Sequence, residues 1–146
     1  MDYLYDKTQY FTINEEQETG ISKLGKSDAN NCSIFSKSDY TSNTDLYLKI
    51  AQAIQFGTAD EHTILLLETE TSKMVQLSNH IAKTTKLVIC FGLTPDQLGL
   101  AVQIVKNRVY RTETYHFIFT DALEDMNRDT EKKKAFWTSI QTHIKQ

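Results

Sequence analysis

The chain has 146 residues, of which 40% are hydrophobic and 24% charged, and this is the length and composition of one folded domain. Its formal net charge of −3 argues against the broad basic surface of a nucleic-acid-binding protein. Its longest apolar stretches, Ile64–Leu67 and Leu87–Phe91, are far shorter than the about 20 residues that a bilayer span requires.

The first 31 residues differ from the rest in composition. Near their start lies an apolar cluster formed by Tyr3, Leu4, Tyr5, Tyr10 and Phe11. These residues are too irregularly spaced to pack as a full element, so we predict an N-terminal arm and linker over residues 1–31. A short strand at Tyr10–Ile13 is the alternative. The start is acidic and aromatic, unlike a signal peptide, so we expect a cytoplasmic protein without membrane contact.

A single folded domain is predicted over residues 32–146. Ser33–Phe35 is a short strand, and residues 39–45 form a polar loop. Thr44 or Asp45 is placed to cap a helix whose apolar residues recur at helical spacing, and Gly57 is placed for its left-handed C-cap.

Two strands with continuous apolar centres are predicted at His62–Glu68 and Leu87–Phe91, as is typical of parallel strands covered on both faces. Between them we predict a helix that begins near Thr71 or Ser72. Its buried residues are predicted to be Met74, Leu77 and Ile81. The alternation of strands and helices predicts right-handed crossovers. We therefore expect the α/β class, as a three-layer α/β/α sandwich with a mainly parallel sheet.

A different pattern follows Gly92. Thr94–Leu98 indicates a turn or short helix, and Val102–Val105 and Val109–Thr112 indicate a hairpin whose turn contains Asn107. Such a hairpin makes the sheet mixed. Tyr115–Phe119 is predicted to be the last strand.

Two helices are predicted at the C-terminal end. Asp121 is placed to cap a short helix, and Asp129 or Thr130 is placed to cap the last one. The inward-facing residues of the last helix are predicted to be Trp137, Ile140 and Ile144. Their spacing follows one helical stripe, which predicts that Trp137 lies in the core.

The sequence contains no recognisable catalytic or metal-binding motif. Its histidines (His62, His80, His116 and His143) are scattered, and Cys32 and Cys90 do not form a CxxC pair. The acidic residues Asp121, Glu124, Asp125 and Asp129 cluster, but two of them occupy cap positions. We predict neither enzymatic activity nor a bound metal or cofactor.

One stretch suggests an alternative. Ile34–Ser36 followed by Thr41–Thr44 resembles the phosphate loop of flavodoxins, and Phe91–Leu93 is faintly similar to a second flavin-side loop. Ser42 stands where those proteins have glycine. A flavodoxin-like FMN-binding electron-transfer domain is therefore the alternative function.

The second half of the chain carries a longer resemblance. The segments that carry it are Leu48–Ile54, Leu87–Leu100, His116–Met126 and Asp129–Trp137. In their order and spacing they resemble the psi subunit of the bacterial DNA polymerase III holoenzyme, in a divergent branch. The features shared with that family are a strand that ends near an aspartate, a short helical turn, and a last helix with lysines and a Phe-Trp pair.

The resemblance implies a small α/β domain without catalysis that functions in bacterial DNA replication. Psi proteins link the clamp loader to the chi subunit and, through chi, to single-stranded-DNA-binding protein, so contact with nucleic acid is indirect. Clamp-loader subunits and a chi-like protein are the implied partners. The family uses an N-terminal arm for the clamp loader, and here we expect Tyr3, Leu4, Tyr5, Tyr10 and Phe11 to make that contact.

Overall fold

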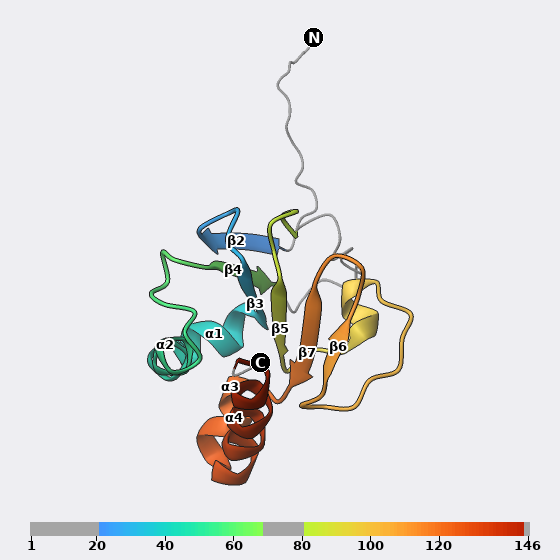
Figure 1. The fold of residues 1–146 in the computed structure, drawn as a ribbon. Coiled ribbons are helices and arrows are strands. Elements are labelled where there is room, and N and C mark those ends of the chain that lie inside the picture. The colour runs from blue at the N-terminus through green and yellow to red at the C-terminus, as the bar shows by residue number, and fades with distance from the viewer. Residues whose placement is uncertain (1–20, 69–80, 145–146) are drawn as a thin grey trace.

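The structure is a computed structural model that describes residues 21–68 and 81–144. Within these ranges six strands form one sheet in the order β2-β4-β3-β5-β7-β6 (Figure 1). The strands are β2 (Ile21–Gly25), β3 (Asn31–Ser36), β4 (Thr63–Leu67), β5 (Leu87–Phe91), β6 (Val109–Arg111) and β7 (His116–Thr120). The four inner strands are parallel, and β2 and β6 pair antiparallel at the two edges. The chain therefore has the α/β class with a mixed sheet.

The inner strands follow directly from the sequence. Every residue of β4 and of β5 is buried, because a central parallel strand is covered on both faces and must be apolar throughout. Both strands lie where the apolar runs predicted them.

All four α-helices in the described part of the chain cover one face of the sheet. They are α1 (Lys37–Ser42), α2 (Thr44–Ala53), α3 (Leu123–Arg128) and α4 (Thr130–Ile144). Tyr47 of α2, Met126 of α3 and Phe136 of α4 are buried against Phe35 and Phe91 of the sheet. This aromatic-rich layer is the larger of the two core clusters in the described residues.

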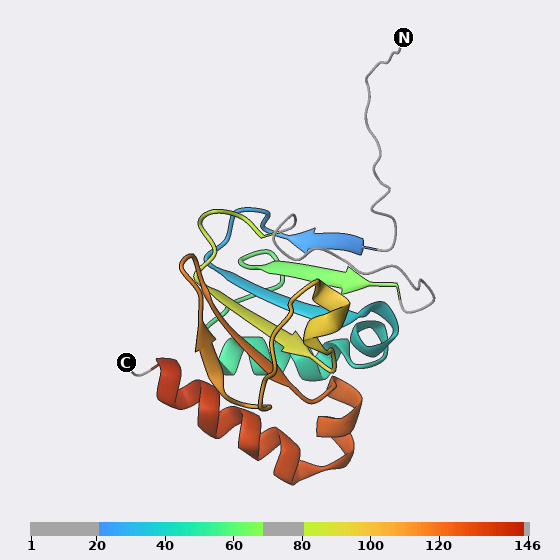
Figure 2. The same cartoon turned by 90° about the vertical axis from the view of Figure 1, so that its right-hand side faces the viewer.

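Of the described residues, those of the connection from β5 to β6 cover much of the second face. Leu98 of the 3₁₀ helix η2 (Pro95–Leu98) packs with Leu93 and Ile104 onto Cys90 and Phe119. Figures 1 and 2 show η2 on the opposite side of the sheet from α2. The helix predicted from Thr71 or Ser72, with Met74 and Leu77, lies outside the described residues. Ile81, the third residue that this helix was predicted to bury, is among the described residues and packs on this second face.

The prediction of a linker up to residue 31 was wrong at its C-terminal end. Ile21–Gly25 forms β2, which pairs antiparallel with β4 from Ile21↔Leu67 to Gly25↔Thr63. The strand buries little, since only Ile21 reaches the second core cluster. Backbone pairing with a neighbouring strand therefore defines this element, and apolar periodicity does not reveal it.

The predicted polar loop at residues 39–45 is helical instead. Ser36 Oγ accepts a hydrogen bond from Asp39 N at 3.3 Å, which caps α1, and Tyr40 is buried. The residue in the left-handed region directly after α2 is Gln55, at φ +68°, rather than Gly57.

The predicted hairpin is formed only in part. Asn107 has the left-handed φ of +64° expected of its turn. Residues 102–105, however, form no strand, and Val102 and Val105 are 48% and 55% exposed. β6 pairs with β7 instead, so the sheet is mixed for a different reason.

Candidate protein-binding groove

The five arm residues predicted to bind a partner, Tyr3, Leu4, Tyr5, Tyr10 and Phe11, lie outside the described residues. The alternative strand at residues 10–13 lies outside them as well. The described part of the chain offers a different surface for a partner, between α2 and α4.

A groove of about 400 Å³ runs between these two helices. Its lining residues are Leu46, Lys49, Ile50 and Ala53 of α2 and Thr130, Lys133, Lys134, Phe136 and Trp137 of α4. On α2 these positions are spaced i, i+3, i+4, i+7. Thr130, Lys133, Lys134 and Trp137 repeat that spacing on α4, and Phe136 lies beside them. Residues at this spacing share one helix face, so each helix presents one continuous stripe to the groove.

Trp137 lies at the edge of the core and not inside it, so the prediction of a core tryptophan was wrong. The buried side chains of α4 are Phe136 and Ile140, which are 1% and 0% exposed. Trp137 is half-buried and packs against the margin of the same cluster. Successive residues of a helix are about 100° apart, so burying Phe136 turns Trp137 toward the groove.

The groove combines an apolar floor with a basic rim. Lys49, Lys133 and Lys134 are all exposed, and within the described ranges none of them forms an ion pair or faces a carboxylate in the lining. An aromatic side chain at the edge of an apolar groove is the kind of residue that anchors protein–protein contacts. Three uncompensated lysines favour a partner segment that carries negative charge.

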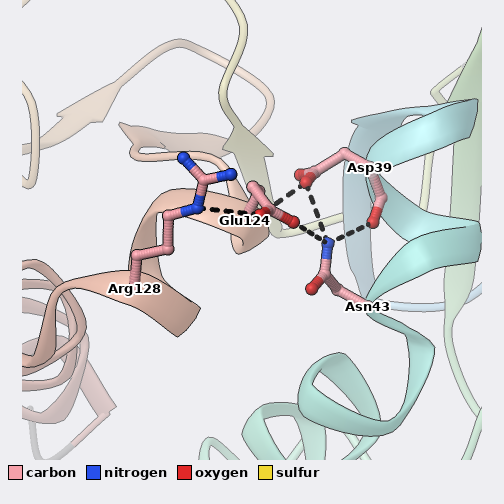
Figure 3. A network of polar contacts seen from close by, with 4 residues as sticks. All are labelled: Asp39, Asn43, Glu124 and Arg128. Carbon is pink, nitrogen blue, oxygen red and sulfur yellow. Dashed lines mark hydrogen bonds and ion pairs between the residues drawn. The ribbon is translucent and has the colours of Figure 1, made fainter.

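A polar network holds the elements that form one wall of this groove (Figure 3). The Asp39 carboxylate accepts hydrogen bonds from Leu123 N at 2.8 Å and Glu124 N at 3.0 Å, at the N-terminus of α3. Asn43 Nδ2 donates to Asp39 O at 3.0 Å and to Glu124 Oε1 at 3.4 Å. Arg128 Nε lies 3.0 Å from Glu124 Oε2. The network ties the junction of α1 and α2 to α3.

Asp39 therefore caps α3, and the prediction that Asp121 does so was wrong. Asp121 Oδ1 instead accepts from Lys106 Nζ at 2.9 Å. A residue 84 positions away supplies the cap, so no local sequence pattern points to it. By contrast, Asp129 Oδ1 accepts from Glu131 N at 3.0 Å, and α4 is capped as predicted.

The threonine hydroxyl groups of the flavodoxin-like stretch donate to backbone carbonyl groups of α1. Thr41 Oγ1 donates to Lys37 O at 2.9 Å, and Thr44 Oγ1 donates to Tyr40 O at 2.7 Å. In the second loop, a Cβ added to Gly92 would come within 2.7 Å of Ala122 Cβ, so the glycine serves a close approach within the fold. These contacts favour a structural role for the stretch over phosphate binding.

A buried polar chain crosses the core between β3, α2 and β4. The Tyr47 hydroxyl lies 2.6 Å from Ser33 Oγ and 2.6 Å from His62 Nε2. His62 Nδ1 donates to Thr58 O at 2.8 Å, because a carbonyl oxygen can only accept. The three side chains are each 0% exposed. Solvent does not reach them, so the chain is structural.

Burial lowers the pKa of His62 from its ordinary value of 6.5, against the opposing effect of hydrogen bonds to the Thr58 and Phe56 carbonyls and of the Glu61 charge. The imidazole is therefore held neutral. A histidine whose pKa is depressed by folding stabilises the fold above its unfolded pKa, and this stabilisation is lost as pH falls through the folded pKa.

We expect the free energy of unfolding to decline as pH is lowered from about 8 to about 5.5, through the ordinary histidine pKa of about 6.5. His62→Gln should flatten this decline while lowering stability at the higher pH. Urea titrations across this pH range measure both effects. His143→Gln is the control and should keep the His62 contribution. A decline that persists unchanged in His62→Gln would contradict the assignment.

Three further observations complete the description. Within residues 21–68 and 81–144, His, Cys, Asp and Glu side chains form no group of three that could hold a metal ion. In the same ranges no helix has the length and apolarity to cross a membrane. Both cysteines are free and buried, and burial raises the pKa of Cys32 to about 12. Cys32 is therefore an unreactive thiol rather than a nucleophile.

Comparison with protein-family models and with curated proteins found no match to this chain.

Proposed function

We propose that this protein is a non-catalytic interaction subunit of the bacterial replication machinery that acts in the cytoplasm, as its resemblance to psi subunits implies. The observation that carries the proposal is the α2–α4 groove, with Trp137 at its edge and three lysines around it. The chemically versatile side chains of the described core, Cys32, Cys90 and His62, are buried. A surface suited to binding and a core without accessible reactive groups favour a connector over an enzyme.

The lining of the groove favours a partner segment that combines apolar side chains with negative charge. Its floor, formed by Leu46, Ile50 and Phe136, suits aliphatic or aromatic anchors. Its rim, formed by Lys49, Lys133 and Lys134, suits aspartate or glutamate beside those anchors. We therefore propose an acidic amphipathic segment of a clamp-loader or chi-like subunit as the occupant. The N-terminal arm with Tyr3, Tyr5 and Phe11 remains the second proposed contact.

We expect Trp137→Ala and Lys133→Glu each to weaken binding of the purified clamp loader from the same organism at least about 10-fold, which corresponds to about 1.4 kcal/mol. The lost aromatic anchor explains the first effect and charge reversal against an acidic segment explains the second. Surface plasmon resonance measures the affinity, and thermal melting verifies that each variant is folded.

Lys132→Glu is the matched control, because Lys132 neighbours Lys133 on α4 but does not line the groove. It should bind like the wild type. Wild-type affinity in both groove variants would overturn the groove as the contact. A chain lacking residues 1–20, which keeps β2, then tests the arm. No binding of clamp loader or chi-like protein by the wild-type chain would overturn the psi-like function itself.

A further inference from the structure

A second surface lies at the opposite end of α4, where the strands β5 and β7 begin. Two clefts of about 610 Å³ and about 460 Å³ adjoin there, and both are lined by Arg111, His116 and His143. The larger cleft also includes Lys86, Glu113 and Tyr115, and the smaller one includes Arg108. Their lining is mostly polar, unlike that of the α2–α4 groove.

The sheet register brings these basic residues together. Arg111 of β6 lies directly opposite His116 of β7, and residues that are opposite in an antiparallel pair project to the same face. His116 in turn pairs with Leu87, the first residue of β5. Lys86 adjoins this pair, and its backbone O accepts a hydrogen bond from His116 N at 2.8 Å. His143, on the last turn of α4, places its ring centroid 5.3 Å from that of His116.

Among the described residues, no ion pair neutralises the basic side chains of this region. Lys86, Arg108 and Arg111 form no ion pair with any described residue. Glu113 is the one acidic residue among the described side chains that line the two clefts. Burial lowers the pKa of His143, and the neighbouring His116 and Arg111 lower it further. The effects of His116 and Arg111, which add to that of burial, indicate positive charge close to His143.

We propose that this cleft binds a phosphate monoester, with the Arg111 guanidinium as its principal donor and with Lys86, His116 and His143 around it. A guanidinium presents paired N–H groups that match two phosphate oxygens. Lys86 adds a second full charge, and the imidazoles of His116 and His143 supply further N–H donors. The proposal is independent of the α2–α4 groove and of the identity of the protein partner.

The charged groups around His143 determine how binding depends on pH. They are Lys86 just before β5, Arg111 of β6, His116 of β7 and Glu113 of the turn between β6 and β7. A bound dianion opposes the cationic groups that depress the pKa of His143, so it raises that pKa and couples binding to proton uptake. Affinity should therefore increase as pH falls from about 8 toward the lowered pKa of His143.

The test is calorimetric titration of the full chain with AMP, with adenosine, and with a single-stranded oligothymidylate that lacks terminal phosphates. We expect AMP to bind, adenosine to bind at least about 10-fold more weakly, and affinity for AMP to rise at lower pH. Arg111→Gln should weaken AMP binding at least about 10-fold. Lys132→Gln removes the same charge from the far end of α4 and should leave binding unchanged.

Three results would overturn the proposal. These are equal binding of AMP and adenosine, equal loss in Arg111→Gln and Lys132→Gln, and absence of AMP binding at millimolar concentration. Tighter binding of the oligothymidylate than of AMP would show that the site binds a phosphodiester backbone and not a phosphate monoester. If Arg111→Gln fails to fold, two other measurements test the proposal. They are AMP binding by His116→Gln and the chemical-shift changes of the histidine ring protons when AMP is added.

Discussion

Phe136→Ala is expected to destabilise the protein by about 3–5 kcal/mol, which is the usual effect of truncating a fully buried phenylalanine. The side chain is 1% exposed, and its ring centroid lies 5.5 Å from that of Phe91 on the sheet. It is the aromatic residue by which α4 packs onto the sheet face. For a domain of this size, each kcal/mol lowers the melting temperature by about 2–4 °C, so thermal melting should show a decrease of roughly 10 °C.

Trp137→Ala is the matched comparison, because it removes the larger side chain from the adjacent position. Trp137 is only half-buried, so its truncation should destabilise clearly less than that of Phe136 while weakening partner binding. The reverse order of stabilities would show that α4 packs through Trp137, and it would refute both the core assignment and the groove.

Tyr47→Phe is expected to destabilise the protein by about 1–3 kcal/mol, although it removes a single oxygen atom. The phenylalanine fills nearly the same space, so no large cavity forms. The hydroxyl, however, is the group that lies between Ser33 Oγ and His62 Nε2 inside the core. Its loss leaves two buried polar groups without that partner, and an unsatisfied buried group loses its hydration without compensation. Urea denaturation measures the difference.

Tyr110→Phe is the control for this prediction. Tyr110 also uses its hydroxyl, which accepts a hydrogen bond from Val105 N at 2.8 Å, but that bond is exposed to solvent. Water replaces the lost partner there, so the change should be clearly smaller than for Tyr47→Phe. Equal effects of the two substitutions would contradict the role assigned to the buried chain.

Local sequence patterns predicted the elements that are stabilised by their own residues. The apolar runs at Ile64–Leu67 and Leu87–Phe91 became β4 and β5, and Thr94–Leu98 became the turn and η2. In each case the pattern that predicts the element is also the one that stabilises it. The class of the fold followed from the order of these elements.

β2, α1 and the cap of α3 were missed. β2 is defined by its pairing with β4, and α3 is capped by Asp39 across 84 positions. Both partners lie outside the window in which periodicity is measured. α1 has its cap, Ser36, directly before it, but the polar composition of the stretch resembles a loop.

The sequence by itself thus determined that the chain forms an α/β domain with a buried parallel core, because a strand that is buried on both faces consists of consecutive apolar residues. Only the tertiary structure decided which residues of α4 face inward and which face the groove. Phe136 and Trp137 are adjacent and both aromatic, and hydrophobicity does not distinguish them; the rotation of the helix against the sheet does. The same holds for Arg111, His116 and His143, which lie on three elements that only the sheet register and helix packing bring together.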